Sequence, residues 1–445
     1  MSQQPRLARR LPVRPGRHRD DRAIVALALP ALGALAADPL YSLIDTAFVG
    51  HLGAVELGAV AVGTAAFTAS FWLFSFLAYG VTPRVARAVG RDDPRGAAQI
   101  GVQALLLAVA LGAIVLVAGL VLAGPVIRLL GAGPRVASFA EPYLRIRILS
   151  APAVLIGLVG HGWLRGAQNT KTPLYVAGAG ALVNVALDYI LIYPVGLGVE
   201  GSAWGTVIGQ WGVAIAFLIL LIPRFKGAPA RPDPGIIRSL LSVGADLIVR
   251  TGALLAALTV ATSVATRMGV VALGSWQVTM QIFLLLSFAL DSIAIAGQAL
   301  VGRHLGAGDQ SRAREVGVRL MAWGLAVGVA LMVALLALRE PIAAAFTDDA
   351  RIVQATVGLL AWLALTQPLS AAAFTLDGIL IGASDTRYLA IAMVGCSLLY
   401  MALALGALSF EWGTAGLAAG ATAWLAARTA ATALRFRGRR WALQP

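Results

Sequence analysis

The chain alternates long apolar runs with short polar or glycine-rich breaks from residue 24 almost to its end. A helix needs roughly 20 apolar residues to cross the hydrocarbon core of a membrane. Runs of this length predict twelve transmembrane helices, at residues 24–49, 57–82, 97–122, 140–163, 173–196, 200–222, 239–266, 271–298, 314–338, 354–381, 388–408 and 413–433. They are too long and continuous for outer-membrane barrel strands, which have about 10 residues of alternating polarity. We therefore expect an all-α membrane protein.

The second half of the pattern repeats the first at an offset of 216 residues (306 − 90 = 216). The positions that recur include the pairs Val85 and Val301, Arg87 and Arg303, Gly90 and Gly306, Gly162 and Gly378, and Gly166 and Gly382. Six predicted helices fall in each half, so both halves cross the membrane in the same orientation, as in transporters with parallel repeats. We therefore predict two pseudo-symmetric six-helix lobes. The predicted segments are a tail at 1–23, an N-lobe at 24–223, a linker at 224–238, a C-lobe at 239–433 and a tail at 434–445.

Composition supports a membrane protein, because 59% of the residues are hydrophobic and 13% are charged, against about 45–50% and about 25% in soluble domains. The formal charge of +14 would suit a nucleic-acid partner, but the arginines gather in the tails and in loops on one side of the predicted topology. This is the pattern of cytoplasmic segments. We expect no nucleic acid, but a multi-pass protein of the bacterial inner membrane with both termini cytoplasmic. Arg145 and Arg147 do not follow the pattern, since they lie near the opposite end of the fourth predicted helix.

Acidic residues inside the predicted helices need a reason, because a charge at the bilayer centre costs on the order of 2.5–3.5 kcal/mol on insertion scales. Asp45 and Asp188 lie about 6 and 10 Å from the outer ends of the first and fifth predicted helices, at 1.5 Å per residue. Asn184 shares a helix face with Asp188, and Thr206 lies at a similar depth in the sixth helix. Asp38 is on about the same face as Asp45, but deeper.

These acids do not follow the repeat, because Ala261 and Ala404 stand 216 residues after Asp45 and Asp188. Two carboxylates in a half-dry cavity cannot easily both be charged, since desolvation and mutual repulsion favour a neutral form of at least one. The pair could therefore accept a proton, and its carboxylate, amide and hydroxyl oxygens could equally hold Na⁺. We expect H⁺ or Na⁺ as coupling ion in the N-lobe, no cofactor, and no metal other than Na⁺ at this site.

Prolines occur inside the first predicted helix, at Pro30 and Pro39. A proline removes a helical hydrogen bond and kinks the helix, which serves either packing or a hinge. Because this helix also carries two acids, we favour the hinge.

The second half has its own charged positions within helices. Arg250 lies about twelve residues into the seventh predicted helix and needs a counter-charge. Asp246, four residues earlier, is on the same face; Asp291 and Asp377 are alternatives. These residues form either a structural ion pair or part of substrate binding or gating between the lobes.

Five stretches carry a resemblance to a known family: Asp38–Gly53, Leu164–Thr170, Asn184–Tyr193, Gly198–Thr206 and Leu376–Arg387. With the two six-helix halves, they resemble the multidrug and toxic compound extrusion (MATE) family, and the first stretch is most similar to its DinF-like branch. The resemblance implies export of bulky organic compounds, often cationic, driven by inward H⁺ or Na⁺. In prokaryotic DinF-type relatives it implies a cation site in the N-lobe, which falls here on Asp45, Asn184, Asp188 and Thr206.

The predicted function is a secondary active antiporter that exports small organic substrates by alternating access between the lobes. We expect a monomer in contact with membrane lipids, and not an enzyme. A lipid or lipid-linked oligosaccharide flippase of the same superfamily is the alternative. It would line its central cavity with several positive side chains, for which Arg250 is the main deep candidate and Arg145 and Arg147 are shallower ones. A membrane-embedded enzyme would need a His, Ser or metal constellation near a membrane face, and the sequence offers none.

Overall fold

The computed structural model describes the backbone of residues 17–443 and the side chains of residues 20–37, 39–68 and 74–443. Helices and the short loops between them make up this part of the chain. Its α-helices are α1 (Arg17–Gly50), α2 (Ala54–Trp72), α3 (Phe76–Gly90), α4 (Pro94–Leu129), α5 (Pro134–Arg147), α6 (Ala151–Gly166), α7 (Lys171–Ile192), α8 (Val199–Leu221), α9 (Pro234–Arg267), α10 (Val270–Gly306), α11 (Gln310–Phe346), α12 (Ala350–Gly382), α13 (Thr386–Ser409) and α14 (Gly413–Arg437).

These fourteen helices make twelve membrane crossings, because two crossings are broken. Short 3₁₀ turns separate α2 from α3 at Leu73–Ser75 and α5 from α6 at Ile148–Ser150. The second break comes just before Pro152, which has no N–H for a helical hydrogen bond. Ten crossings are apolar and long enough to span a membrane by themselves; the others are the α2–α3 pair and α14. The prediction of an all-α membrane protein with twelve helices is confirmed, although the sequence pattern did not predict the breaks.

Several elements extend past the predicted apolar runs. α9 begins at Pro234, inside the predicted linker, where the Asp233 side chain accepts from two backbone N–H groups of the first turn. α14 continues to Arg437, inside the predicted C-terminal tail, and the predicted N-terminal tail is helical from Arg17 onward. Residues 1–16 and 444–445 of the two predicted tails lie outside the described residues. Polar helix ends project beyond the hydrocarbon layer, so an apolar run marks only the central part of each helix.

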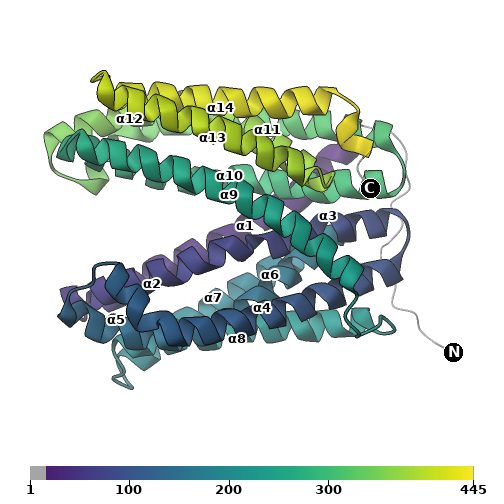
Figure 1. Ribbon diagram of the computed structural model, residues 1–445, viewed down its shortest axis with the longest axis horizontal. Coiled ribbons are helices and arrows are strands. Elements are labelled where there is room, and N and C mark those ends of the chain that lie inside the picture. Colours follow the sequence, from purple (N-terminus) through teal and green to yellow (C-terminus); the bar gives the residue numbers. More distant parts are fainter. Residues whose placement is uncertain (1–16, 444–445) are drawn as a thin grey trace.

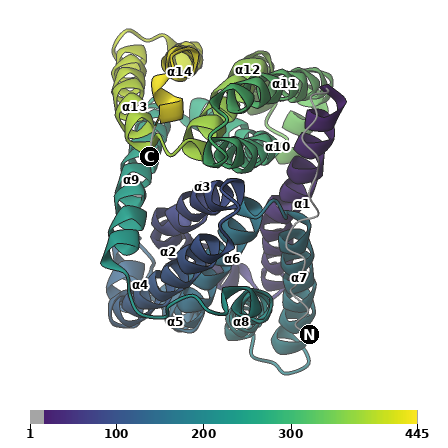
Figure 2. The same ribbon diagram turned by 90° about the vertical axis from the view of Figure 1, so that its right-hand side faces the viewer.

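The helices form two groups, with α2–α8 in one and α10–α14 in the other (Figure 1). The groups come together at the end of the molecule where α1 begins and α14 ends, and they diverge at the other end (Figure 1). We call these ends the terminal side and the opposite side. α1 and α9, the first helices of the two lobes, run along the lobe interface on different flanks (Figure 2). α1 contacts both α7 and α10, and α9 contacts both α13 and α3.

Near the terminal side α1 is attached to the C-lobe by ion pairs. Arg312 donates to Asp20 at 2.6 Å, and Arg319 donates to both carboxylate oxygens of Asp21 at 2.5 and 2.7 Å. The indole of Trp323 also donates to Asp21, at 2.7 Å. Further along, Asp45 on the same helix is bonded within the N-lobe. The first part of α1 is therefore bonded to the C-lobe, and its last part is bonded to the N-lobe.

α9 mirrors this arrangement from the other half of the chain. Arg84 of the N-lobe donates to the hydroxyl of Ser239 at 2.6 Å, and the backbone N–H of Asp233 donates to Gln103 at 2.9 Å. Gly244 leaves room for the ring of Phe76, since a Cβ there would lie 2.8 Å from the ring. Each lobe thus holds the first helix of the other on the terminal side.

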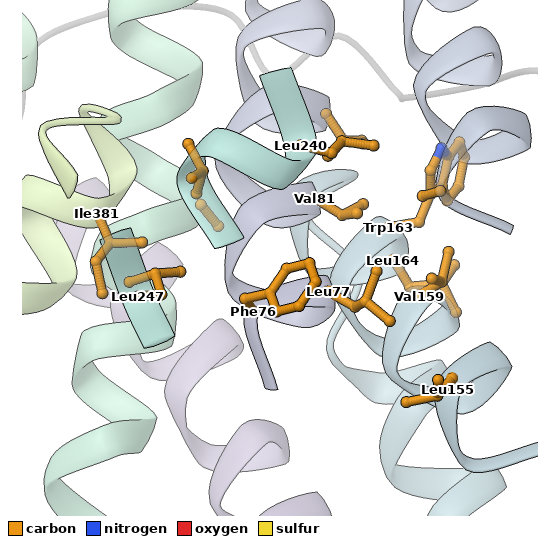
Figure 3. Packing of buried hydrophobic residues seen from close by; sticks show 14 of the residues in the cluster. Phe76, Leu77, Val81, Leu155, Val159, Trp163, Leu164, Leu240, Leu247 and Ile381 are labelled. Atoms are coloured by element: carbon orange, nitrogen blue, oxygen red, sulfur yellow. The ribbon is translucent and has the colours of Figure 1, made fainter. Parts of the chain in front are cut away.

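A hydrophobic cluster crosses the lobe interface at this end. Its residues come from helices of both lobes. The members labelled in Figure 3 belong to α3, α6, α9 and α12, and they are Phe76, Leu77, Val81, Leu155, Val159, Trp163, Leu164, Leu240, Leu247 and Ile381. Because this core is shared by both lobes, the packed terminal side is the main contact between them.

Candidate functional site

A buried hydrogen bond ties α1 to α8 within the N-lobe. The hydroxyl of Ser202 donates to Asp45 Oδ1 at 2.6 Å, and the exposed fraction of Asp45 is only 7%. Asp45 is therefore held where the sequence predicted, inside the N-lobe and near the opposite side. Its hydroxyl partner was not predicted, although Ser202 lies one helical turn before the predicted Thr206 on the same helix face.

Asp188, Asn184 and Thr206 come together between α7 and α8. Asp188 is completely buried. The side-chain amide of Asn184 is oriented so that both its nitrogen and its oxygen have hydrogen-bond partners. The amide nitrogen donates to Asp188 Oδ2 at 3.0 Å, and the amide oxygen accepts from the backbone N–H of Thr206 at 3.2 Å. The hydroxyl of Thr206 lies 3.3 Å from the same amide oxygen. The four residues that the sequence selected thus form one polar group, which we call the N-lobe acid group: Asp45, Asn184, Asp188 and Thr206.

The close approach of α7 and α8 depends on Gly205. A Cβ added there would lie 3.1 Å from both the backbone nitrogen and the Cγ of Asp188, so the carboxylate occupies the space that a side chain would need. Oδ1 of Asp188 is buried and has no hydrogen-bond partner among the described residues. A buried carboxylate oxygen without a donor is costly to keep charged, so this atom is suited to receive a proton.

An arginine belongs to the same group. Arg147, at the end of α5 and beside the helix break, is 8% exposed, and its Cζ lies 4.7 Å from the centroid of the Phe67 ring. It has a side-chain hydrogen bond to Tyr41 and lies within electrostatic range of Asp45 and Asp188. This is one of the two arginines that departed from the predicted charge pattern. Its departure from the charge pattern was the one sign in the sequence that Arg147 has a buried partner, but the pattern does not identify the acids as that partner.

A cavity of about 110 Å³ adjoins the N-lobe acid group. Its lining includes Tyr41, Asn184, Thr206, Gln210 and, toward the terminal side, His161. Pockets for drug-sized ligands usually have about 300–1,000 Å³, so this cavity has room for water but not for a bulky substrate.

Three further predicted positions, Pro30, Asp38 and Pro39, lie on α1. Pro30 and Pro39 lie within α1, which is helical from end to end, and between the part bonded to the C-lobe and the part bonded to the N-lobe. The side chain of Asp38 lies outside the described residues, although its backbone is part of α1.

The C-lobe contains a separate set of charges. Asp377 on α12 accepts hydrogen bonds from both Arg250 on α9 and Arg428 on α14. Asp246 does not neutralise Arg250; it accepts instead from the hydroxyl of Thr386 on α13, at 2.8 Å. Of the three acids offered by the sequence, the partner is thus Asp377.

Arg428 was missed by the sequence analysis. It is 3% exposed, and its Cζ lies 5.2 Å from the centroid of the Phe374 ring and 5.7 Å from that of Trp424. It is the only charged residue between 413 and 433, which was a usable signal. The pair of arginines around one carboxylate joins three helices of the C-lobe.

Asp291 on α10 lies within electrostatic range of this set and of Arg165 and Tyr79 from the N-lobe. It therefore connects the C-lobe charges to the lobe interface. The C-lobe positions equivalent to Asp45 and Asp188 carry no acidic side chain. Ala261 and Ala404 are both fully buried in an apolar cluster of the C-lobe, so that lobe has packing where the N-lobe has carboxylates.

Comparisons with known proteins cover most of the chain. The family model described as MatE matches residues 30–190 and 253–405. Protein DETOXIFICATION 44, chloroplastic, from Arabidopsis thaliana is 34% identical over 446 residues, with 95% of this chain and 83% of that protein covered. DNA damage-inducible protein F from Escherichia coli (strain K12) is 31% identical, with 86% of each chain covered. A crystal structure of MATE in the bent conformation has a TM-score of 0.86 at 21% identity and 95% coverage of both chains, which shows a common fold.

Proposed function

Because the chain belongs to the multidrug and toxic compound extrusion (MATE) family of membrane transporters, we propose that it exports bulky organic compounds in exchange for inward-moving protons. Membership makes the chain a transporter and not an enzyme. The observation that carries the proposed coupling is the buried N-lobe acid group, because carboxylates inside a membrane protein mark ion pathways and proton relays. Its confinement to one lobe supports coupling within the N-lobe.

The hydrogen bonding of the acid group favours a proton over Na⁺. Asn184 donates to Asp188, and Ser202 donates to Asp45, so both carboxylates are held by neutral donors. Sodium needs several oxygen ligands directed at one point, whereas a proton needs a single free lone pair. Asp188 Oδ1 offers such a lone pair. Coupling to Na⁺ is the alternative, in which the Asn184 amide would turn its oxygen toward the ion.

Alternating access would use the contacts of α1. Its first part is bonded to the C-lobe through Asp20 and Asp21, and its last part to the N-lobe through Asp45. A proton that enters at Asp188 and moves to Asp45 would weaken the bond from Ser202 to Asp45 and let α1 bend at Pro30 and Pro39. Substrate would leave on the opposite side, where the two groups of helices diverge (Figure 1). The lobes would then close on that side and release the proton on the other.

We propose a monomer in the bacterial inner membrane, with the terminal side in the cytoplasm. The arginine-rich loops of the terminal side support this orientation. The flippase alternative is less favoured, because Arg250 and Arg428 both bind Asp377 and are not free to hold a diphosphate headgroup. Substrates are small organic molecules, and among them cations are the expected class.

The test is transport in proteoliposomes across a panel of fluorescent organic cations, with the pH gradient and the sodium gradient imposed separately. Asp45→Asn and Asp188→Asn should abolish the part of efflux that depends on the gradient. The control is Glu200→Gln, since this exposed acid lies in the first turn of α8, outside the acid group. Undiminished pH-driven efflux in both Asn variants would overturn the proposal, and efflux driven only by sodium would replace H⁺ with Na⁺.

A further inference from the structure

Arg147 is the charged residue of the N-lobe that the proposed coupling does not yet use. It is one of the most buried arginines of the chain and lies within electrostatic range of both acids of the acid group. Burying a charge is costly unless another charge or a hydrogen-bond network compensates it. A transporter that needed only two acids would have no reason to carry this cost, so the arginine has a role there.

Among the residues whose side chains the structure describes, none forms a direct ion pair with Arg147. Its guanidinium is held by Tyr41 and by the face of the Phe67 ring, and its Nε has no partner among the described residues. The two arginines of the C-lobe differ, because both bind Asp377 directly. Arg147 therefore acts on the carboxylates through space, as a fixed positive charge.

Arg147 stands directly before the break in its membrane crossing. α5 ends at Arg147, and the hydroxyl of Ser150 donates to the Arg147 carbonyl at 2.7 Å within the 3₁₀ turn. The guanidinium of Arg147 contacts Phe67 of α2 and Tyr41 of α1. Arg145, two positions earlier, remains outside the group: its side chain is 53% exposed and pairs with Glu141 at 2.8 Å.

We propose that Arg147 is a built-in counter-charge that limits the N-lobe acid group to one coupling cation per transport cycle. This rests on the proposed function. With both acids ionised the group has two negative charges and one positive charge, a sum of −1, which one H⁺ neutralises. Without the arginine the sum would be −2, and full neutralisation would need two cations. The arginine is thus a residue that determines coupling stoichiometry.

The other described groups that face Arg147 do not change this count. Tyr143 shares a hydrogen bond with Thr64 at 3.1 Å, and Tyr41 is neutral. The side chain of Asp38 lies outside the described residues, so its contribution is tested separately below. The pairs on the surface, such as Arg145 with Glu141, are screened by solvent.

The first experiment measures the number of cations moved per substrate molecule, from the membrane potential at which net transport stops in proteoliposomes with a fixed pH gradient. Wild type, Arg145→Met and Arg147→Lys should each give one cation, because all three keep the buried positive charge. Arg147→Met should give two. Asp38→Asn should leave the wild-type value unchanged. A value of one in Arg147→Met, or of two in Arg147→Lys, would overturn the inference.

A second variant covers the case in which Arg147→Met does not transport. Asp45→Asn alone leaves one acid beside the arginine, a sum of zero, so coupling should be lost. Adding Arg147→Met to Asp45→Asn restores a sum of −1 and should restore coupling to one cation. Failure of this rescue would refute the counter-charge while leaving the proposed function intact. Loss of all gradient dependence in the wild type would instead refute the proposed function.

Discussion

Gly90 and Gly306, which occupy equivalent positions in the two halves of the chain, each pack against the helix that carries the other on the terminal side. A Cβ on Gly306 would lie 2.5 Å from the Cα of Arg87, and a Cβ on Gly90 would lie 2.9 Å from the backbone nitrogen of Ala307. The backbones of α3 and α10 meet only because neither residue has a side chain. Since the two contacts are exchanged by the repeat, the pseudo-two-fold axis passes between these helices.

Replacing Gly306 with leucine should therefore disfavour the state in which the terminal side is packed. Overpacking of a close contact typically costs about 1–3 kcal/mol, and each 1.4 kcal/mol shifts an equilibrium about tenfold. With Cys396 replaced by serine, spin labels on cysteines at His51 and Phe410 would report the separation of the lobes on the opposite side. The variant should show a larger population at short distances than the parent.

Gly358→Leu is the matched control, because an added Cβ at this position contacts nothing within 4 Å. It should leave the distance distribution unchanged. An unchanged distribution in Gly306→Leu as well would show that the contact between α3 and α10 does not hold the terminal side together.

The position of Asp188 in the N-lobe acid group also requires that Gly205 has no side chain. Alanine at this position would push the carboxylate of Asp188 away from its place between α7 and α8. We expect Gly205→Ala to lower pH-driven efflux and to destabilise the protein by about 1–3 kcal/mol. Gly212→Ala, on the same helix but with open space around its Cβ, should transport like the wild type. Equal coupling in both variants would mean that the position of Asp188 is not critical.

The composition of the N-lobe acid group could be predicted from sequence because helix geometry fixes depth and face. Asp45, Asn184, Asp188 and Thr206 were each placed by counting residues from a helix end, and the structure brings them together. Ser202 was missed, because a serine in an apolar helix carries no pattern of its own.

Helix breaks and pairings between distant helices could not be predicted in the same way. Arg147 lies within electrostatic range of the acids at the point where a 3₁₀ turn interrupts its crossing, and an apolar run shows neither the turn nor the contact. Arg250 has three acids at a plausible depth, and the choice of Asp377 depends on how α9, α12 and α14 pack. The repeat predicted that Gly90 and Gly306 are equivalent, but not that their helices meet at the axis.

Asp377, Arg250 and Arg428 should stabilise the C-lobe jointly, so that the effects of replacing them are not additive. Removing one partner of such a pair leaves an uncompensated charge and typically costs about 3–5 kcal/mol. Asp377→Asn leaves both Arg250 and Arg428 without their carboxylate, so it should lower the unfolding temperature in detergent more than Arg250→Met does. Combining Asp377→Asn with Arg428→Met should recover part of the loss. A double variant less stable than Asp377→Asn alone would contradict this account of the cluster.

The ion pairs between α1 and α11 predict a salt-dependent contact on the terminal side. Arg312 with Asp20 and Arg319 with Asp21 are only partly buried, so salt should screen them. Replacing both acids with asparagine should loosen this side, because α1 would lose its attachment to the C-lobe. Gln168, which donates to the Ala299 carbonyl across the lobe interface at 2.8 Å, is the reporter position. A cysteine there should react faster with a maleimide in the double Asn variant.

Salt separates the role of these ion pairs from a general loss of stability. In the parent protein, raising the salt concentration should speed the labelling of a cysteine at Gln168, whereas in the double Asn variant it should have little further effect. Asp349→Asn is the control, because its ion pair with Arg351 at 3.2 Å lies on the opposite side and should not alter labelling. If salt speeds labelling equally in the parent and in the double variant, the ion pairs of α1 do not hold the terminal side closed, and the shared hydrophobic cluster alone must do so.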